Sequence, residues 1–168
     1  KTRYIGVSNY DAAQMARALE TGFFHSNQPR YNMFDRDIEI ADLPFCREQG
    51  IGVLAHSPLA KGLLTNIYRP GYIFPDADER SGFPRFQGAL FNSYIAVADQ
   101  LAAVASDKGL SLVQMAIAWL LRREEVSCVL VGAKNEAQMR EHLGAAEVSW
   151  SADELAAIDA ILRDAPAG

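Results

Sequence analysis

The segment most informative about the fold reads Gly50-Ile-Gly-Val-Leu-Ala-His-Ser-Pro-Leu-Ala-Lys-Gly-Leu-Leu64. Residues 51–55 are apolar without alternation, which is typical of a parallel strand that is covered on both faces. A helix expected over 35–49 ends at Gly50, because a residue without Cβ readily takes the left-handed conformation of a C-terminal cap. After the strand, a polar turn begins at His56. The segment therefore predicts helix, strand and polar turn in that order.

The alternation of strand and helix extends from this segment in both directions. Further strands are expected over 4–7, 23–28 and 128–131, and further helices over 11–22, over 94–109, and from Ser111, Asn135 and Ser151 onward. Polar residues with a Gln or Glu three positions later mark several of these helix starts as capping boxes. Because the strands recur at intervals above the ~30 residues of one βαβ unit, the pattern indicates a parallel sheet with right-handed crossovers. A doubly wound open sheet and half of an eight-stranded barrel both satisfy it.

A single domain over residues 1–168 is expected, interrupted by a long loop at about 57–87. That loop holds four of the seven prolines and little periodicity. Loops of this length in a compact domain are usually functional.

Composition excludes several classes of function. Sixteen basic and 21 acidic residues give a net charge of −5, and no continuous basic surface is available for nucleic acid. The residues contain no basic stretch followed by an apolar run of the length found in leader peptides, and no apolar run near the ~20 residues of a membrane span, so we expect neither export nor membrane insertion. Both cysteines, Cys46 and Cys128, lie in apolar runs, so we expect two buried thiols and a cytoplasmic protein. No metal site is expected.

The residues that end each strand are polar, and in parallel α/β folds ligands collect at these carboxyl ends. Neither a G-x-G-x-x-G fingerprint nor a P-loop follows any strand, so a nucleotide would have to be held in another way. The strand ends read Ser8-Asn9, Asn27-Gln28, His56-Ser57-Pro58-Leu59 and Gly132-Ala-Lys134-Asn135.

Seven segments, taken in order and spacing, resemble the aldo-keto reductases. They are Ile5-Gly-Val-Ser-Asn9, Asn27-Gln-Pro-Arg-Tyr-Asn-Met-Phe34, Pro44-Phe-Cys-Arg-Glu48, the Gly50–Leu64 segment, Pro84-Arg-Phe86, Ala116-Ile-Ala-Trp-Leu120 and Val131-Gly-Ala-Lys-Asn135. The resemblance implies a TIM barrel, a (β/α)8 fold, of which this chain would supply the last four β/α units and a C-terminal helix. It also implies that NADP(H) lies across the carboxyl ends of the strands and reduces a small-molecule aldehyde or ketone.

By the family pattern, the nicotinamide carboxamide would be bound by Ser8, Asn9 and Gln28. Amide side chains suit this role because they offer both a donor and an acceptor. The residues alone favour the simpler explanation that these side chains cap helices and end strands. His56 stands where the family usually has an aromatic residue against the nicotinamide ring. This departure leaves less apolar area and introduces a group that can become charged.

The family pattern also assigns the phosphate groups of the cofactor. Ser57, Leu59, Lys61 and Gly62 would surround the pyrophosphate. At the start of the helix after residue 131, unpaired N–H groups and the helix dipole favour an anion, which the family pattern identifies as the 2′-phosphate. The residues implied around the 2′-phosphate and the adenosine are Gly132, Lys134, Gln138, Glu141 and His142. The last of these replaces a usual asparagine, which puts the adenine contacts in doubt.

The family's catalytic tyrosine, lysine, aspartate and histidine belong to its first four strands, so no catalytic residue is assigned in this chain, and we expect it to be inactive alone. Four strands cannot close a barrel, because their outer edges would stay unpaired. The expected partner is therefore an N-terminal half-barrel or a second copy of the chain. Two other functions stay open: a nucleotide-binding regulatory module, as in channel-associated β-subunits, and a stand-alone half-barrel that binds another phosphate ligand.

Overall fold

A parallel sheet forms the centre of the protein. The computed structural model describes residues 1–166, and within them β1 (Gly6–Ser8), β2 (Ser26–Gln28), β3 (Gly52–His56) and β4 (Val126–Leu130) pair in the order β1-β2-β3-β4. All three pairings are parallel, and a register shift between Val53 and Leu54 interrupts the β3–β4 ladder. Consecutive strands are thus neighbours, as repeated βαβ units require.

Helices and short 3-10 turns connect the strands. The helices are α1 (Ala12–Leu19), α2 (Asp42–Gln49), α3 (Gly88–Asp107), α4 (Leu112–Leu121), α5 (Glu136–Leu143) and α6 (Ala152–Leu162). Asp11, Ser111 and Ser151 form the expected capping boxes, Asn135 caps α5, and Gly50 ends α2 at φ 66°. The 3-10 turns are Asp37–Glu39, Ala60–Thr65, Glu79–Gly82, Pro84–Phe86 and Gly144–Glu147.

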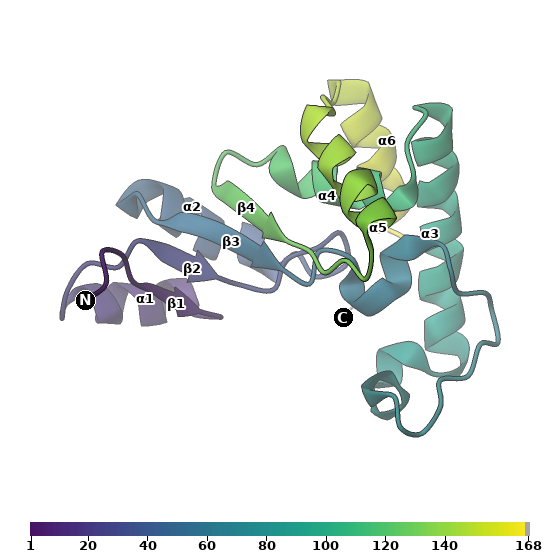
Figure 1. Cartoon of the computed structure of the whole chain (residues 1–168), viewed down its shortest axis with the longest axis horizontal. Coiled ribbons are helices and arrows are strands. Elements are labelled where there is room, and N and C mark those ends of the chain that lie inside the picture. Colours follow the sequence, from purple (N-terminus) through teal and green to yellow (C-terminus); the bar gives the residue numbers. More distant parts are fainter. Residues whose placement is uncertain (167–168) are drawn as a thin grey trace.

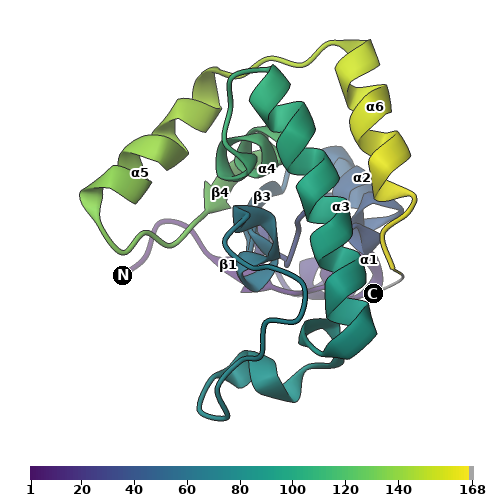
Figure 2. The ribbon, with the colours of Figure 1, turned by 90° about the vertical axis from the view of Figure 1, so that its right-hand side faces the viewer.

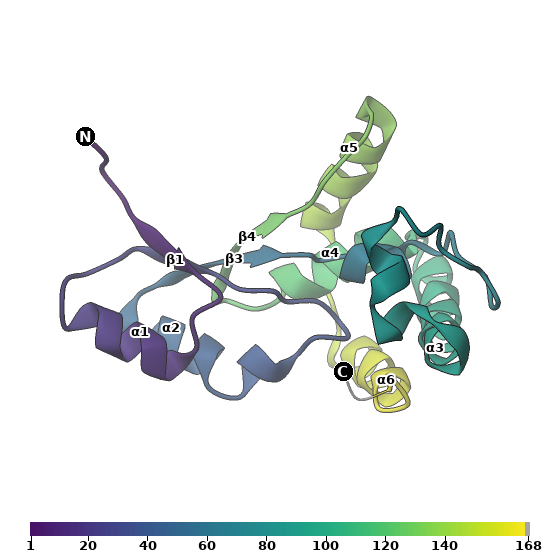
Figure 3. The same cartoon turned by 90° about the horizontal axis from the view of Figure 1, so that it is seen from below.

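The first two helices lie on one side of the sheet, as Figure 3 shows for α1 and α2 below β1 and β3. At the other end of the molecule α6 runs alongside α3, and α5 projects away from both (Figure 2). The main core lies between these helices and the sheet, and its largest fully buried side chains include Trp119, Tyr94, Phe91, Met115 and Leu101.

Three expected helix boundaries were wrong. The helix expected over 11–22 ends at Leu19 with Glu20 as its C-cap. The predicted helix over 35–49 is a 3-10 turn followed by α2, which begins only at Asp42. Pro44 explains the late start, because proline lacks an N–H and is accommodated only in the first turn of a helix. Conversely, α3 begins at Gly88 rather than at residue 94.

Burial of the strands also differs from the expectation. Along β3, Val53 and Ala55 are fully buried, whereas Leu54 between them is only partly covered. The prediction of a strand covered on both faces is therefore wrong for the described residues, because the flanking helices α1 and α2 share one face of the sheet. The thiol of Cys128 is likewise exposed on the edge strand β4, while Cys46 is buried as expected.

The 57–87 segment packs against α3 and away from β1 (Figure 1). As predicted it contains little regular structure, only three short 3-10 turns. An aromatic cluster stabilises it, in which Phe74 contacts the rings of Tyr68, Phe86 and Phe91 at centroid distances of 5.0 to 5.7 Å. The segment is therefore joined to the main core, because Phe91 belongs to α3.

Within the described residues, no helix is long and apolar enough to cross a membrane by itself. The helices α3 and α4 pass that test only as a pair bent by 86°.

Candidate functional site

Three strand ends form one polar surface at the carboxyl edge of the sheet. Backbone hydrogen bonds hold it together: the N–H of Asn9 donates to the carbonyl of Gln28 at 3.2 Å, and the N–H of His56 donates to that of Pro29 at 3.0 Å. The hydroxyl of Ser8 also donates to the Gln28 carbonyl, at 3.0 Å. The parallel register thus brings together the residues predicted to bind a nicotinamide.

The imidazole of His56 links two of these strand ends. Its Nε2 lies 3.0 Å from Oδ1 of Asn9, and its Nδ1 lies 3.0 Å from the hydroxyl of Ser57. The Asn9 oxygen also accepts the backbone N–H of Arg30 at 3.1 Å, which fixes it as an acceptor. Nε2 therefore carries the proton of the neutral ring, and the Ser57 hydroxyl donates to Nδ1.

Electrostatics favour the neutral form of this ring. Burial lowers the pKa of His56 below its usual 6.5, and the positive charge of Arg30 lowers that pKa further. The histidine is therefore uncharged near neutral pH and keeps the hydrogen bond that orients Asn9.

Unusual backbone geometry is concentrated at the same surface. Among the described residues, Asn9, Ser57, Ala60 and Lys61 have φ between 47° and 56°, the left-handed region that non-glycine residues seldom adopt. Such strain costs about 1–3 kcal/mol per residue and is typical of functional sites. Within residues 1–166, the one other non-glycine residue in this region is Asn66, which belongs to the same 57–87 segment.

The first turn of that segment is tightly folded. Leu59 (φ −97°, ψ 15°) is followed by Ala60 with a φ of 47°, and the N–H groups of Ala60 and Gly62 donate to the carbonyls of Ser57 and Leu59, at 3.0 and 2.8 Å. Gly62 has a φ of 103°, and a Cβ there would lie 3.0 Å from a ring carbon of Tyr68. Nearby, the ammonium group of Lys61 pairs with Glu79 at 2.5 Å.

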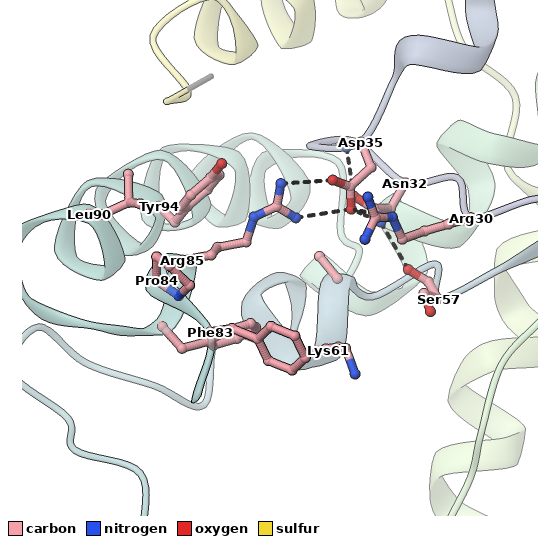
Figure 4. A pocket seen from close by; sticks show the side chains of 12 residues that line it. Arg30, Asn32, Asp35, Ser57, Lys61, Phe83, Pro84, Arg85, Leu90 and Tyr94 are labelled. Atoms are coloured by element: carbon pink, nitrogen blue, oxygen red, sulfur yellow. Dashed lines mark hydrogen bonds and ion pairs between the residues drawn. The ribbon is translucent and has the colours of Figure 1, made fainter. Parts of the chain in front are cut away.

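A cavity of about 330 Å³ opens beside this turn. On one side, Arg85 donates two hydrogen bonds, at 2.7 and 3.0 Å, to the carboxylate of Asp35 (Figure 4). The buried amide of Asn32 donates to the same carboxylate at 2.8 Å and to the carbonyl of Ser57 at 3.1 Å. The residues lining the cavity are Arg30, Asn32, Asp35, Ser57, Ala60, Lys61, Phe83, Pro84, Arg85, Phe86, Leu90 and Tyr94.

A second cavity of about 410 Å³ adjoins the ends of β1 and β3. Asn9 and His56 line it, and Arg30 and Asp35 line both cavities. The polar surface at the strand ends is thus accessible from two sides.

The predicted 2′-phosphate and adenosine residues lie apart, after β4 and along α5. The backbone N–H of Lys134 donates to the side chain of Gln138 at 2.8 Å, so an anion at this N–H would displace that amide oxygen. Glu141 is partly buried, and His142 is buried with Nδ1 unpaired among the described residues. An unpaired buried nitrogen is unusual and leaves this histidine one bond to offer.

Five aromatic side chains of the loop after β2 and of the 57–87 segment have structural roles. Tyr31 is fully buried against Trp119, and its hydroxyl donates to Glu39 at 2.6 Å. Phe34 packs on Tyr94. Tyr68, Tyr72 and Phe74 belong to the aromatic cluster of the 57–87 segment, and none of these five lines either cavity.

Three charged residues of the site escaped the sequence reasoning. Arg30 directly follows a strand end and was detectable on that ground. Asp35 and Arg85 are separated by 50 residues, so only the folded chain shows them as a pair.

Comparison with known proteins identifies the class. The family model described as "Aldo/keto reductase family" matches residues 1–163, so this chain belongs to the aldo-keto reductases. The fold is accordingly that of the TIM-barrel family. The chain is 34% identical over 140 residues to the aldo-keto reductase YhdN of Bacillus subtilis, and the match covers 83% of this chain and 42% of that protein. It is 32% identical over 161 residues to the aldo-keto reductase str7 of Strobilurus tenacellus, covering 94% and 48% respectively.

Solved structures agree with this assignment. A glycerol dehydrogenase from Gluconobacter oxydans superimposes with a TM-score of 0.91 at 32% identity, over 99% of this chain and 50% of that one. A thermostable aldo-keto reductase, Tm1743, solved with the inhibitor epalrestat, gives a TM-score of 0.69 at 26% identity, over 95% and 48%. The chain thus spans about half the length of the relatives it matches.

Proposed function

We propose that this chain is the cofactor-binding half of an NADPH-dependent reductase of aldehydes or ketones. In this proposal the four strands are the last four of an eight-stranded barrel. Membership of the oxidoreductase family supports the reaction class, and the polar, strained surface at the carboxyl ends of β1 and β3 supports the position of the site.

The single observation that carries the proposal is the His56 bridge. One imidazole holds Asn9 and Ser57, two residues with left-handed backbones on different strand ends. The chain therefore maintains a costly geometry at the position where the family pattern places the nicotinamide. Oδ1 of Asn9 is engaged by His56 and Arg30, and its amide nitrogen donates one hydrogen bond to the hydroxyl of Ser8 at 3.4 Å, so its second N–H would serve an acceptor such as the nicotinamide carbonyl.

The residues present fit the phosphates of the cofactor as well. In the turn from Ser57 to Gly62, the ammonium group of Lys61 would exchange its partner Glu79 for the pyrophosphate. Lys134 is exposed at the start of α5, where its ammonium group would pair with the 2′-phosphate. When bound, the nicotinamide would supply the hydride, while these residues bind and orient it.

The catalytic tyrosine, lysine, aspartate and histidine are proposed to come from a second half-barrel. Both outer strands support such a partner. At β1 the side chains of Tyr4 and Ile5 are 70% and 56% exposed, and at β4 Leu130 and the thiol of Cys128 are exposed beside Leu143 of α5. Open apolar edges of this kind require a cover.

Cys128 offers a direct test of that partner. In the 168-residue chain alone, a disulfide reagent should modify Cys128 rapidly and Cys46 slowly, because burial raises the pKa of the Cys46 thiol to about 11. In the protein expressed from its complete coding sequence, Cys128 should be protected. Equal modification of Cys128 in both proteins would contradict the half-barrel partner. Both thiols are free, and a cytoplasmic location stays part of the proposal on that basis.

Cofactor binding and turnover are tested separately. We expect NADPH to change the fluorescence of Trp119 and Trp150, and NADH to do so only at higher concentration. An aldehyde should then cause loss of nicotinamide absorbance with the complete protein and none with the 168-residue chain. Binding without turnover in the complete protein would instead favour the regulatory module, which the similarity to reductases does not favour. A response to other phosphate compounds alone would favour the stand-alone phosphate-binding domain.

A further inference from the structure

Arg30 is a charged residue of the site that the proposed cofactor contacts do not use. Its backbone N–H donates to Asn9, and it forms an isolated parallel bridge with His56, so it begins beside the ends of β1 and β3. Its side chain is 59% exposed and lines both the 330 Å³ and the 410 Å³ cavity. Arg30 therefore lies between the two openings of the proposed nicotinamide site.

The charge of Arg30 is not neutralised by its neighbour. Its Nε lies 3.6 Å from Oδ2 of Asp35, beyond hydrogen-bond distance. The Asp35 carboxylate already accepts two hydrogen bonds from Arg85 and one from Asn32. Figure 4 shows the two guanidinium groups approaching this carboxylate from opposite sides. On the side of the 330 Å³ cavity, two positive charges thus share one negative charge. The 410 Å³ cavity is lined by Asp11, Asp37 and Asp42 as well, so an anion would reach Arg30 from the 330 Å³ side.

The chemistry of the spare group defines what it can bind. A guanidinium offers five N–H donors in a planar fork, which matches the two oxygens of a carboxylate or of a phosphate. The other cations that line the 330 Å³ cavity are engaged, Arg85 with Asp35 and Lys61 with Glu79. The positive charge of Arg30 also helps to lower the pKa of His56. The guanidinium group therefore lies within electrostatic reach of that imidazole ring.

We propose that Arg30 binds the anionic group of the carbonyl substrate, so that this protein prefers aldehydes or ketones that carry a carboxylate or a phosphate. The assignment rests on the proposed function, because it takes the ends of β1 and β3 as the nicotinamide side of the site. A neutral substrate would leave the guanidinium without a partner. An anionic substrate would displace the water that solvates the guanidinium group and form two charge-assisted hydrogen bonds with it.

Two matched aldehydes test this preference: 4-carboxybenzaldehyde, which is anionic at neutral pH, and benzaldehyde, which is not. Activity is measured with the protein from its complete coding sequence, for wild type, Arg30→Ala, Arg30→Lys and Arg17→Ala. Arg17 is an exposed arginine in the last turn of α1, at the end of that helix remote from the carboxyl ends of the strands, and serves as the control.

Loss of a hydrogen bond between charged groups predicts a fall in kcat/KM of about 10- to 100-fold for the carboxylated aldehyde in Arg30→Ala. The change should appear mainly in KM. Benzaldehyde should change less than about threefold, and so should the dissociation constant of NADPH measured by fluorescence. Arg30→Lys should recover part of the preference, and added salt should weaken it because the group is exposed.

The remaining outcomes overturn the assignment in different ways. An equal loss for both aldehydes would show that Arg30 only supports the fold, and no loss for either would show that its charge is unused. Weaker NADPH binding with unchanged aldehyde preference would assign Arg30 to a cofactor phosphate. A wild-type protein that reduces neither aldehyde would refute the proposed function and this assignment with it.

Discussion

Removal of the Asp35 charge is the perturbation whose effect can be worked out most fully. Asp35 joins the loop after β2 to Arg85 of the 57–87 segment, and both side chains are largely buried, at 11% and 19% exposure. Burial raises the pKa of Asp35, but hydrogen bonds from Arg85 and Asn32 and the charges of Arg85 and Arg30 outweigh it, so the pKa is lowered overall.

The size of the effect follows from the geometry. Opposite unit charges about 4 Å apart interact by about 4 kcal/mol at the effective dielectric constant of a protein surface. The desolvation that burial imposes offsets part of this attraction. We therefore expect Asp35→Asn to lower the free energy of unfolding by about 2–4 kcal/mol at pH 7, since two arginines lose their partner.

Urea denaturation of the protein from its complete coding sequence measures this loss. A double-mutant cycle with Arg85→Met should give a coupling of about 2 kcal/mol or more. The control cycle pairs Glu136→Gln with Arg140→Met on α5. That ion pair is about three-quarters exposed on both sides and should couple by less than about 0.5 kcal/mol.

Acid provides an independent check. Because the folded pKa of Asp35 is lowered, its contribution to stability is present above the unfolded value of 3.8 and is lost as the pH falls through the folded value. The difference between wild type and Asp35→Asn should therefore shrink below about pH 4. A coupling as small as that of the control pair, or a difference that stays constant with pH, would refute the reasoning.

Three further predictions concern the cofactor surface. Lys134→Ala should weaken NADPH binding at least about tenfold and leave NADH binding nearly unchanged. The control Arg140→Ala, on α5, should change neither dissociation constant when each nucleotide is titrated. Equal losses of NADPH and NADH affinity in Lys134→Ala would contradict the 2′-phosphate role. Gly62→Ala should destabilise the protein by about 1–2 kcal/mol in urea, because its φ of 103° is strained for alanine, while Gly82→Ala, with open space around it, should change little. Since the folded pKa of His56 lies below 6.5, stability should fall as the pH drops below 6.5, and His56→Gln should reduce that slope; an unchanged slope would contradict the burial of the ring.

Local chemistry made most of the elements predictable. The pairs Asp11 with Gln14, Ser111 with Gln114, and Ser151 with Glu154 form capping boxes as expected, because both partners lie within one helical turn. The order of strands and their parallel pairing follow from the same local alternation. The predicted start of α2 was wrong because a single residue, Pro44, limits where a helix can begin regardless of the apolar periodicity.

Burial was less predictable, because apolar character does not say how many layers cover a strand. Leu54 and Cys128 are as apolar as their buried neighbours, yet they face the uncovered side and edge of the sheet. That difference depends on where the helices lie, which no local pattern contains.

The sequence by itself determined the family, the alternation of strand and helix, and the polar residues that end each strand, because these depend on residues close together in the chain. Only the tertiary structure decided how those ends combine. It joined Asn9 to His56 across 47 positions and Asp35 to Arg85 across 50. The charge left on Arg30 follows from that second pairing, since a carboxylate already held by one arginine cannot fully neutralise another.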